Sequence, residues 1–278
     1  MKLTELLKSI EVVQMLGNTD IEITAIQADS RRIENGNLFV AQTGTVVDGH
    51  EFIAQCIAQG AFAVVLDNPL YMPTESNGTT YILVKNSNQA LGQMAHKWYG
   101  EPSKALRLIG VTGTNGKTTS KELISTVLSK EYNVLYTQGN LNNHIGVPLT
   151  LLRLNRSHNI AVVEMGANHP EEIAFLCKIA RPNYGIITNV GKAHLEGFGS
   201  FEGVKKTKGE LYEWIAGVDG KIFLHADNPH LVKMAGDLYT IKYGEAGDNF
   251  VSGKIISCTP YINVNLNLNG NASGENQT

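Results

Sequence analysis

The stretch GVTGTNGKT, residues 110–118, decides the fold because it joins an apolar run to a helical pattern through a glycine-rich turn. The apolar run covers 106–111, and apolar side chains repeat at helical spacing over 123–128. Glycines let backbone N–H groups close around phosphate oxygens, and a helix N-terminus adds partial positive charge. We therefore predict a loop that holds the triphosphate of ATP together with magnesium. The residues predicted to contact the nucleotide are Gly113, Thr114, Asn115, Gly116, Lys117, Thr118 and Thr119.

Two side chains of this loop carry specific chemistry. Lys117 can reach the β and γ phosphates, and the Thr118 hydroxyl can ligate magnesium. The glycine spacing is unusual, with five residues between Gly110 and Gly116 but only two between Gly113 and Gly116, so a GTPase or a kinase is disfavoured. The alternative, a strand–turn–helix without a ligand, is weak because Gly-Lys-Thr-Thr is specific in this context.

Polar residues follow other predicted strands, at the edge where ligands of parallel sheets collect. Glu164 directly follows the apolar run 160–163 and is a candidate magnesium ligand, unless it is a surface carboxylate or a helix cap. His194, after another predicted strand, is a candidate metal ligand or acid/base, although a lone histidine is more often structural. Asn142 and Asn143 suit a polar substrate or, equally well, a turn.

The run KKTKGE, residues 205–210, begins a helical pattern. Such a run is most often a solvated basic turn. Clustered cations disfavour one another's charge, however, and a lysine made neutral in this way becomes nucleophilic and open to modification. The run is therefore a candidate site for a modified lysine.

Strand and helix patterns divide the chain into two α/β domains. Residues 1–84 form a small first domain, which opens with an amphipathic helix over 1–16. Residues 85–278 form the second domain, whose short apolar runs alternate with helical patterns, as in a mostly parallel sheet flanked by helices on both faces. The predicted strands are 21–25, 37–42, 63–66, 81–84, 106–111, 133–137, 160–163, 184–190, 221–225 and, at an edge, 263–269.

The composition argues against several classes of protein. A net charge of −3 and a pI of about 6.2 give no sign of a nucleic-acid-binding surface. The three cysteines are far apart, which fits a reducing cytoplasm better than a disulfide framework. No stretch approaches the roughly 18 apolar residues of a membrane span, and the N-terminus does not read as a signal peptide.

Five segments together resemble the Mur ligases of peptidoglycan synthesis, and the resemblance covers essentially the whole chain. GNLNNHIGVPLTLL and EMGANHP resemble the branch that adds D-alanyl-D-alanine, whereas the DSR and DGH segments are shared with the branch that adds the third amino acid. The five segments are ADSRRIENGNLFVAQTGTVVDGHEFI (28–53), VTGTNGKTT (111–119), GNLNNHIGVPLTLL (139–152), VVEMGANHPEEI (162–173) and GKAHLEGFGSFEGVKKTKGELY (191–212).

The resemblance implies a central domain that binds ATP and two magnesium ions. Thr118 and Glu164 match ligands of one ion, and His194 matches a histidine at the second. Lys208 matches a lysine that is carbamylated in this family, which gives an anion able to ligate magnesium. Asn228 is a further candidate neighbour of the nucleotide. The predicted catalytic residues are Lys117, His194 and Lys208.

The resemblance also implies that the first domain binds a UDP-sugar through the DSR and DGH segments. A physical reading agrees for Ser30 and Arg31, which can donate hydrogen bonds to diphosphate or uracil oxygens. The predicted substrate-binding residues are Ser30, Arg31, Asp48, Gly49, His50, Asn142 and Asn143.

The implied reaction is ATP-dependent amide ligation by a cytoplasmic monomer. The carboxylate of UDP-MurNAc-tripeptide takes the γ-phosphate of ATP, and the amine of D-alanyl-D-alanine then displaces phosphate from the acyl phosphate. The family carries a third, C-terminal domain without a counterpart here, so we expect a truncated chain that ends in a hairpin over 270–278. Two alternatives remain, namely another ligase of the superfamily, such as the third-amino-acid branch or folylpolyglutamate synthase, and a non-catalytic fragment that binds nucleotide and UDP-sugar.

Overall fold

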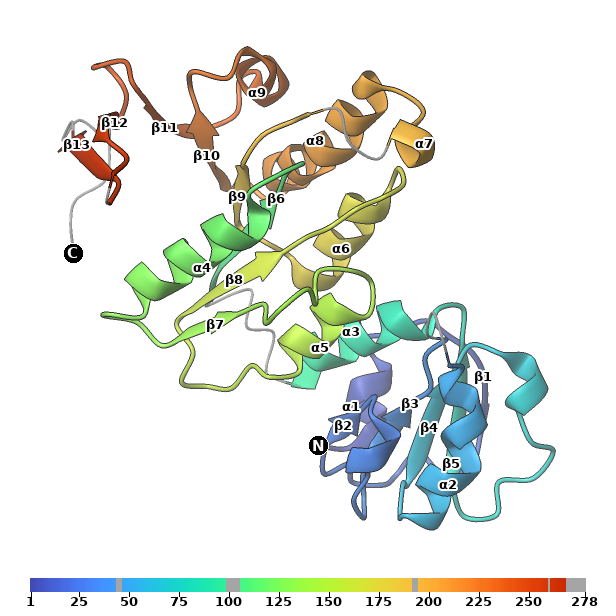
Figure 1. The fold of residues 1–278 in the computed structure, drawn as a ribbon. Helices are drawn as coiled ribbons and strands as arrows, with labels where there is room; N and C mark the ends of the chain where they lie inside the picture. Colours follow the sequence, from blue (N-terminus) through green and yellow to red (C-terminus); the bar gives the residue numbers. More distant parts are fainter. Residues whose placement is uncertain (44–46, 99–105, 192–194, 260, 269–278) are drawn as a thin grey trace. The chain divides into compact units, whose positions relative to one another are not determined.

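The computed structural model shows two compact units, each built around its own sheet (Figure 1). The first unit contains Met1–Leu106 and Thr137–Asn159, and the second contains Arg107–Tyr136 and Ile160–Thr278. The segment after the phosphate loop therefore packs with the first unit, although it lies between two strands of the second in sequence. The assignment of 1–84 to the UDP-sugar and of 85–278 to ATP stays a prediction. The structure describes residues 1–43, 47–98, 106–191, 195–259 and 261–268.

The first unit has a five-stranded sheet in the order β1-β5-β4-β3-β2. Neighbouring strands from β2 to β5 are parallel, and β1 pairs antiparallel with β5. The elements are α1 (Leu3–Leu7), β1 (Val12–Leu16), β2 (Ile26–Gln27), η1 (Ser30–Arg32), β3 (Leu38–Val40), η2 (Gly49–Phe52), α2 (Ile53–Ala58), β4 (Ala63–Leu66), η3 (Pro69–Tyr71), β5 (Thr80–Val84), α3 (Ser87–Trp98) and α5 (Gly146–Leu151).

Alternation along the strands buries both faces of this sheet. Leu38 and Val40 of β3 point into one apolar cluster, which includes Leu91 of α3. Phe39 points to the other face, where it packs in a cluster with Cys56 of α2. Continuous apolar strands of this kind are typical of a parallel sheet covered by helices, so the predicted α/β class is confirmed.

Two predictions at the N-terminus were wrong. The helix predicted over 1–16 ends at Leu7, and Val12–Leu16 forms β1. The β-branched Val12 and Val13 favour a strand, and pairing with β5 satisfies the backbone there. The strand predicted at 21–25 is reduced to one isolated bridge between Lys2 and Glu22, although Ile23 is buried.

The second unit has an eight-stranded sheet in the order β13-β12-β11-β10-β9-β6-β8-β7. All neighbouring pairs are parallel except β12 and β13. The elements are β6 (Arg107–Thr112), α4 (Lys117–Leu128), β7 (Val134–Tyr136), β8 (Ile160–Glu164), α6 (Glu172–Ala180), β9 (Tyr184–Ile187), α7 (Leu195–Phe198), α8 (Phe201–Gly217), β10 (Lys221–His225), α9 (Pro229–Ala235), β11 (Thr240–Gly244), β12 (Val251–Ser257) and β13 (Asn263–Leu268).

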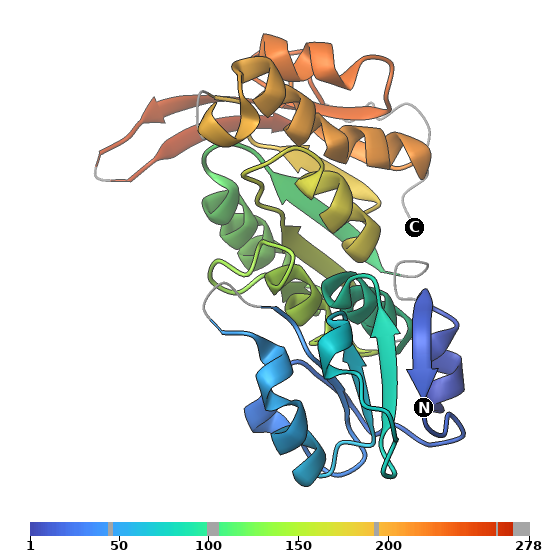
Figure 2. The same cartoon turned by 90° about the vertical axis from the view of Figure 1, so that its right-hand side faces the viewer.

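Helices cover both faces of this sheet, with α4 on one side and α6 and α8 on the other (Figure 2). Ile109 and Val111 of β6 pack with Ile124 of α4. The residue between them, Gly110, faces α8, where a Cβ would stand 3.1 Å from a Leu211 methyl group. A glycine in mid-strand therefore allows α8 to approach the sheet closely.

The edge strand predicted at 263–269 is confirmed as β13, whose partner β12 was not predicted. The hairpin expected over 270–278 lies outside the described residues. In the parts of the chain that the structure describes, no helix is both long and apolar enough to cross a lipid bilayer.

Candidate functional site

The predicted phosphate loop is the turn between β6 and α4. Gly113 and Gly116 have φ values of +141° and +77°, which side-chain-bearing residues rarely adopt. A Cβ on Gly113 would also collide with Oγ1 of Thr188, whereas the space beside Gly116 is open. Because α4 begins at Lys117, its first N–H groups have no partner within the helix and face the loop.

The end of β9 holds this loop in place. The N–H of Thr114 donates to the Asn189 carbonyl at 3.0 Å, and that of Asn115 donates to Asn189 Oδ1 at 3.1 Å. Asn189 Nδ2 and Thr188 Oγ1 both donate to the Asn115 carbonyl, at 3.0 and 2.6 Å. This role was not predicted, because the strand was expected to continue through 184–190, whereas β9 ends at Ile187. Two polar residues at the end of an otherwise apolar run were the available signal.

The Lys117 ammonium bends back over the loop. Its Nζ donates to the carbonyls of Gly113 and Thr114, at 3.0 and 3.2 Å. A cation held there stands beside the N–H groups that begin α4, so the loop gathers positive potential from both sources. Thr119 lies exposed on the first turn of α4.

Thr118 and Glu164 meet at the carboxyl end of the sheet. Strands β6 and β8 are parallel neighbours with Val111 opposite Glu164, so the loop and the carboxylate reach the same edge. Thr118 Oγ1 donates to Glu164 Oε1 at 3.2 Å, and Glu164 is only 1% exposed. A hydroxyl and one carboxylate fit Mg²⁺, which takes few protein ligands when phosphate oxygens and waters supply the rest.

No cluster of three or more His, Cys, Asp or Glu side chains that could hold a metal is found among the described residues. His194, the predicted ligand of a second ion, lies outside the described residues.

Lys208 lies on α8 and is 3% exposed. Its Nζ donates to the Ala167 carbonyl at 3.4 Å and lies 5.5 Å from the centroid of the Phe198 ring. Burial, and after it the positive charge of Lys117, lower the pKa of Lys208 to about 8. The sequence led us to expect this effect from the neighbouring lysines of the run 205–208, but the cation that contributes is Lys117 of the phosphate loop.

Glu172 is a carboxylate near this lysine that was not predicted from the sequence. Burial alone would raise the pKa of Glu172, but N–H donors bring it below its ordinary value. These donors are the N–H groups of Asn168 and His169, at 2.6 and 3.0 Å from Glu172 Oε2. The same bonds order the loop that presents the Ala167 carbonyl to Lys208.

Asn228 forms the N-cap of α9. Its Oδ1 accepts from the N–H groups of His230 and Leu231, at 3.1 and 3.3 Å. The neighbouring Asp227 accepts from the Glu245 N–H at 2.8 Å. Asn228 thus stabilises the start of α9, and Asp227 joins the segments that follow β10 and β11. Contact of Asn228 with a nucleotide stays a prediction.

In the first unit, Ser30 and Arg31 follow the carboxyl end of β2. Arg31 pairs with Asp29 through two hydrogen bonds, of 2.9 Å from Nε and 2.8 Å from Nη2. The Arg31 side chain is 85% exposed, so its remaining donors face solvent. Ser30 is half-buried in the first turn of η1.

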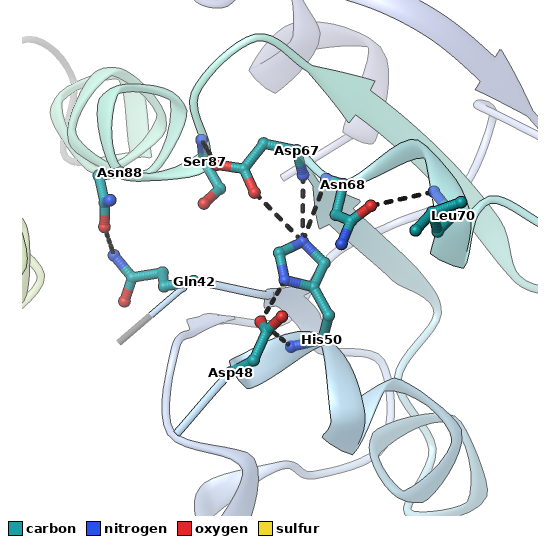
Figure 3. Close-up of polar contacts among 8 residues, drawn as sticks. All are labelled: Gln42, Asp48, His50, Asp67, Asn68, Leu70, Ser87 and Asn88. Carbon is teal, nitrogen blue, oxygen red and sulfur yellow. Dashed lines mark hydrogen bonds and ion pairs between the residues drawn. The ribbon is translucent and has the colours of Figure 1, made fainter. Parts of the chain in front are cut away.

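Within the Asp48-Gly49-His50 segment, His50 is buried, whereas Asp48 and Gly49 are partly exposed. Figure 3 shows how the His50 ring is enclosed by polar partners. His50 is 0% exposed, and its Nδ1 lies 2.6 Å from Asp48 Oδ1. A Cβ on Gly49 would stand 2.6 Å from the Gln42 carbonyl, so this close approach requires glycine. Direct contact of His50 with a substrate would require this arrangement to open.

Asn142 and Asn143 also belong to the first unit. Asn143 Oδ1 accepts from the N–H groups of Ile145 and Gly146, at 3.1 and 2.9 Å, in the turn before α5. The side-chain oxygen of Asn143 therefore stabilises a turn, as expected if Asn143 is a turn residue. A substrate role for the two asparagines stays a prediction.

An open parallel sheet with a glycine-rich loop, a lysine and a strand-end carboxylate at its carboxyl edge defines a protein of the phosphate-loop class. More narrowly, the chain belongs to the Mur ligase family. Residues 111–270 match the Mur ligase middle domain, and residues 22–99 match the domain described as the Mur ligase family catalytic domain. The predicted family is confirmed.

The similar relatives and solved structures within the family include D-alanyl-D-alanine-adding ligases, also called MurF. The chain is 38% identical to the UDP-N-acetylmuramoyl-tripeptide–D-alanyl-D-alanine ligase of Haemophilus influenzae, over 81% of this chain and 49% of that protein. The crystal structure of MurF from Acinetobacter baumannii has a TM-score of 0.77 and 32% identity, covering 91% and 55% of the two chains. MurF from Thermotoga maritima in complex with ADP has a TM-score of 0.72 and 33% identity, covering 83% and 52%. The chain thus spans about half the length of the curated relatives it matches.

Proposed function

We propose that this chain carries the ATP site and the UDP-sugar site of a ligase that joins D-alanyl-D-alanine to UDP-MurNAc-tripeptide in peptidoglycan precursor synthesis. The main support is the 3.2 Å contact between Thr118 and Glu164 beside the Lys117 ammonium. The proposed substrates are those in the names of the relatives, which are D-alanyl-D-alanine-adding ligases. We further propose that the protein acts as a monomer in the cytoplasm.

The proposed reaction transfers the γ-phosphate of ATP to the peptide carboxylate, which gives an acyl phosphate and ADP. The amine of D-alanyl-D-alanine then attacks the acyl carbon, phosphate leaves and the amine loses a proton. Negative charge develops on the transferred phosphoryl group, where Lys117 and the N–H groups at the start of α4 stabilise it. Thr118 and Glu164 would hold Mg²⁺, which neutralises phosphate charge when bound.

Lys208 has a second role in the proposal, as the carbamylated lysine. A neutral amine attacks carbon dioxide, an N–C bond forms and a proton is released, which leaves a carbamate anion. The pKa of about 8 supports this step, because a substantial fraction of the lysine is neutral near physiological pH. With His194, the carbamate would help to hold a second Mg²⁺.

The UDP-sugar is proposed to bind the first unit beside β2 and β3. The exposed donors of Arg31 and the half-buried hydroxyl of Ser30 support binding to diphosphate or uracil oxygens. Asp48-Gly49-His50 and the pair Asn142 and Asn143 are proposed to shape the same site.

A thermal-shift panel tests the proposal. We expect UDP-MurNAc-tripeptide to raise the melting temperature more than UDP-MurNAc-dipeptide, and Mg²⁺ with a non-hydrolysable ATP analogue to raise it as well. A larger shift with the dipeptide would assign the chain to the branch that adds the third amino acid. A shift with the ATP analogue but with neither UDP-sugar would contradict the proposed substrate.

A further inference from the structure

The imidazole of His50 joins two segments of the first unit, the turn at Asp48 and the residues after β4 (Figure 3). It comes from η2, just after the turn that follows β3. Its Nδ1 faces the Asp48 carboxylate at 2.6 Å, and its Nε2 faces the residues that follow β4. There, the N–H groups of Asp67 and Asn68 both donate to Nε2, at 3.3 Å each.

These contacts place the proton of the ring. A nitrogen that accepts from two backbone N–H groups carries no proton, so Nε2 is the unprotonated nitrogen. Nδ1 then carries the proton and donates to Asp48 Oδ1. Asp67 Oδ1, 3.2 Å from Nε2, would accept a proton placed on Nε2, but that proton would also face the two N–H donors. The neutral Nδ1–H form of His50 therefore satisfies all the backbone donors around it.

The same network continues into helix α3. Asp67 Oδ2 accepts from the N–H of Ser87, the first residue of α3, at 2.9 Å. A parallel link joins Gln42, after β3, to Asn88 through a buried 2.5 Å hydrogen bond. The polypeptide that leaves β3 is thus fixed to β4 and to α3 by the buried side chains of His50, Gln42 and Asn88 and by the partly exposed carboxylates of Asp48 and Asp67.

The location of this network gives it a role. In open parallel sheets, ligands bind beyond the carboxyl ends of the strands. Strand β3 is the neighbour of β2, so the Asp48–His50 turn and the Ser30–Arg31 segment leave the same edge of the sheet. His50 has no surface with which to touch a ligand, whereas the turn that it fixes lies at this edge.

We propose that His50 is a positioning residue for the nucleotide-sugar site. As a neutral Nδ1–H imidazole it fixes the Asp48–Gly49 turn against Asp67 and Asn68, and it acts on the substrate only through that turn. The proposal rests on the proposed function, since it needs a UDP-sugar at this edge. It replaces direct contact of His50 with the substrate.

The first test is the proton position in the wild-type protein, by ¹⁵N NMR of the imidazole at neutral pH. The expected spectrum is that of a neutral ring with a protonated Nδ1 and a hydrogen-bonded, unprotonated Nε2. A ring protonated at Nε2, alone or together with Nδ1, overturns the proposal. This measurement needs no variant and does not depend on ligand binding.

The second test is calorimetric titration with UDP-MurNAc-tripeptide and, separately, with Mg²⁺ and a non-hydrolysable ATP analogue. His50→Ala is expected to weaken the UDP-sugar about tenfold or more, as loss of an orienting partner typically does, and to leave the ATP analogue within about twofold. His50→Asn keeps a donor directed at Asp48 and is expected to restore most of the affinity. Lys2→Ala, which breaks the exposed Lys2–Asp20 pair, is the matched control and should change neither affinity.

The outcomes separate this proposal from the proposed function. If wild type binds the UDP-sugar and a folded His50→Ala variant binds it equally well, the positioning role is refuted and the function stands. If His50→Asn binds the UDP-sugar as weakly as His50→Ala, the donor to Asp48 is not what matters, and the proposal fails. If folded wild type does not bind the UDP-sugar, the proposed function fails and this role falls with it.

Discussion

The Thr118 hydroxyl donates a hydrogen bond of 3.2 Å to the Glu164 carboxylate, although 46 residues separate them in the chain. Parallel pairing of β6 with β8 brings the two together, because both strands end at the same edge. Glu164 is 1% exposed, so its carboxylate is held at the loop instead of being free to turn into solvent. This pair is the best-supported candidate for holding Mg²⁺ against the phosphates of a nucleotide.

Glu164→Gln should weaken nucleotide binding only when Mg²⁺ is present. The amide keeps the shape and still accepts from Thr118, but it lacks the charge that Mg²⁺ prefers. We expect a loss of about 1.5–3 kcal/mol in the affinity for Mg²⁺ with the ATP analogue, the range for interactions with charged groups. Titrations with and without Mg²⁺ measure it. An equal loss in both titrations would contradict a metal role for Glu164.

Lys117→Ala should abolish measurable ATP binding. The ammonium lies over the loop, and its loss removes the charge that would meet the β and γ phosphates. A decrease in affinity of more than about a hundredfold is expected, at about 1.5–3 kcal/mol for each charge-assisted bond. Lys130→Ala, at an exposed position beyond α4, is the control. Unchanged affinity in Lys117→Ala would refute the phosphate loop.

Gly113→Ala should damage both the loop and the fold of the second unit. The φ of +141° disfavours alanine, and its Cβ would displace Thr188 and with it the bonds that hold the loop. We expect a loss of about 1–3 kcal/mol of unfolding free energy from the backbone strain alone, and lost nucleotide binding. Gly217→Ala, in α8 with open space around its Cβ, should be neutral or slightly stabilising. Equal melting temperatures for the two variants would contradict the described loop geometry.

Replacing Lys208 should change the pH dependence of stability in a defined direction. Its pKa falls from 10.5 to about 8 on folding, through burial and then the charge of Lys117. The unfolded state therefore holds more protons between pH 8 and 10.5, so wild type gains stability as the pH rises through that range and loses it as the pH falls. Lys208→Met removes the free-energy cost of burying a charged amine. It should be more stable than wild type below pH 8, by about 3 kcal/mol at most, and the advantage should disappear towards pH 10.5.

Chemical denaturation of both proteins across that pH range, in bicarbonate-free buffer to keep the lysine unmodified, measures the effect. A stability difference that does not change with pH would contradict the assigned shift. Activity of Lys208→Met equal to wild type would remove Lys208 from the proposed catalytic set.

Local patterns predicted the parts of the fold that local sequence controls. The run Ala63–Leu66 is apolar throughout and is β4 with the predicted bounds, because buried parallel strands need no polar face. The prediction for Val12–Leu16 was wrong for two reasons. The charged and apolar residues around this segment fit a helical period, and its partner strand β5 lies far along the chain. Strand β12 was not predicted either, because its sequence is of mixed polarity and it is stabilised by pairing with β13.

Sequence predicted the composition of the site better than its internal contacts. Glycine spacing and a carboxylate after an apolar strand identified the loop and Glu164. No local pattern reveals burial, so His50 was expected to touch substrate although it is 0% exposed. The polar residues at the end of β9 were a weak signal for Asn189, but its contacts with the loop depend on β9 lying next to β6, which local sequence does not show.

The central claim, that this site activates a peptide carboxylate with ATP, is tested most directly by trapping the acyl phosphate. The protein would be incubated with ATP, Mg²⁺, UDP-MurNAc-tripeptide and hydroxylamine, without D-alanyl-D-alanine, and the hydroxamate measured together with ADP. We predict hydroxamate and ADP in equal amounts, dependent on the tripeptide and absent in Lys117→Ala. ADP formed without hydroxamate, or the same yield without the UDP-sugar, would contradict the claim.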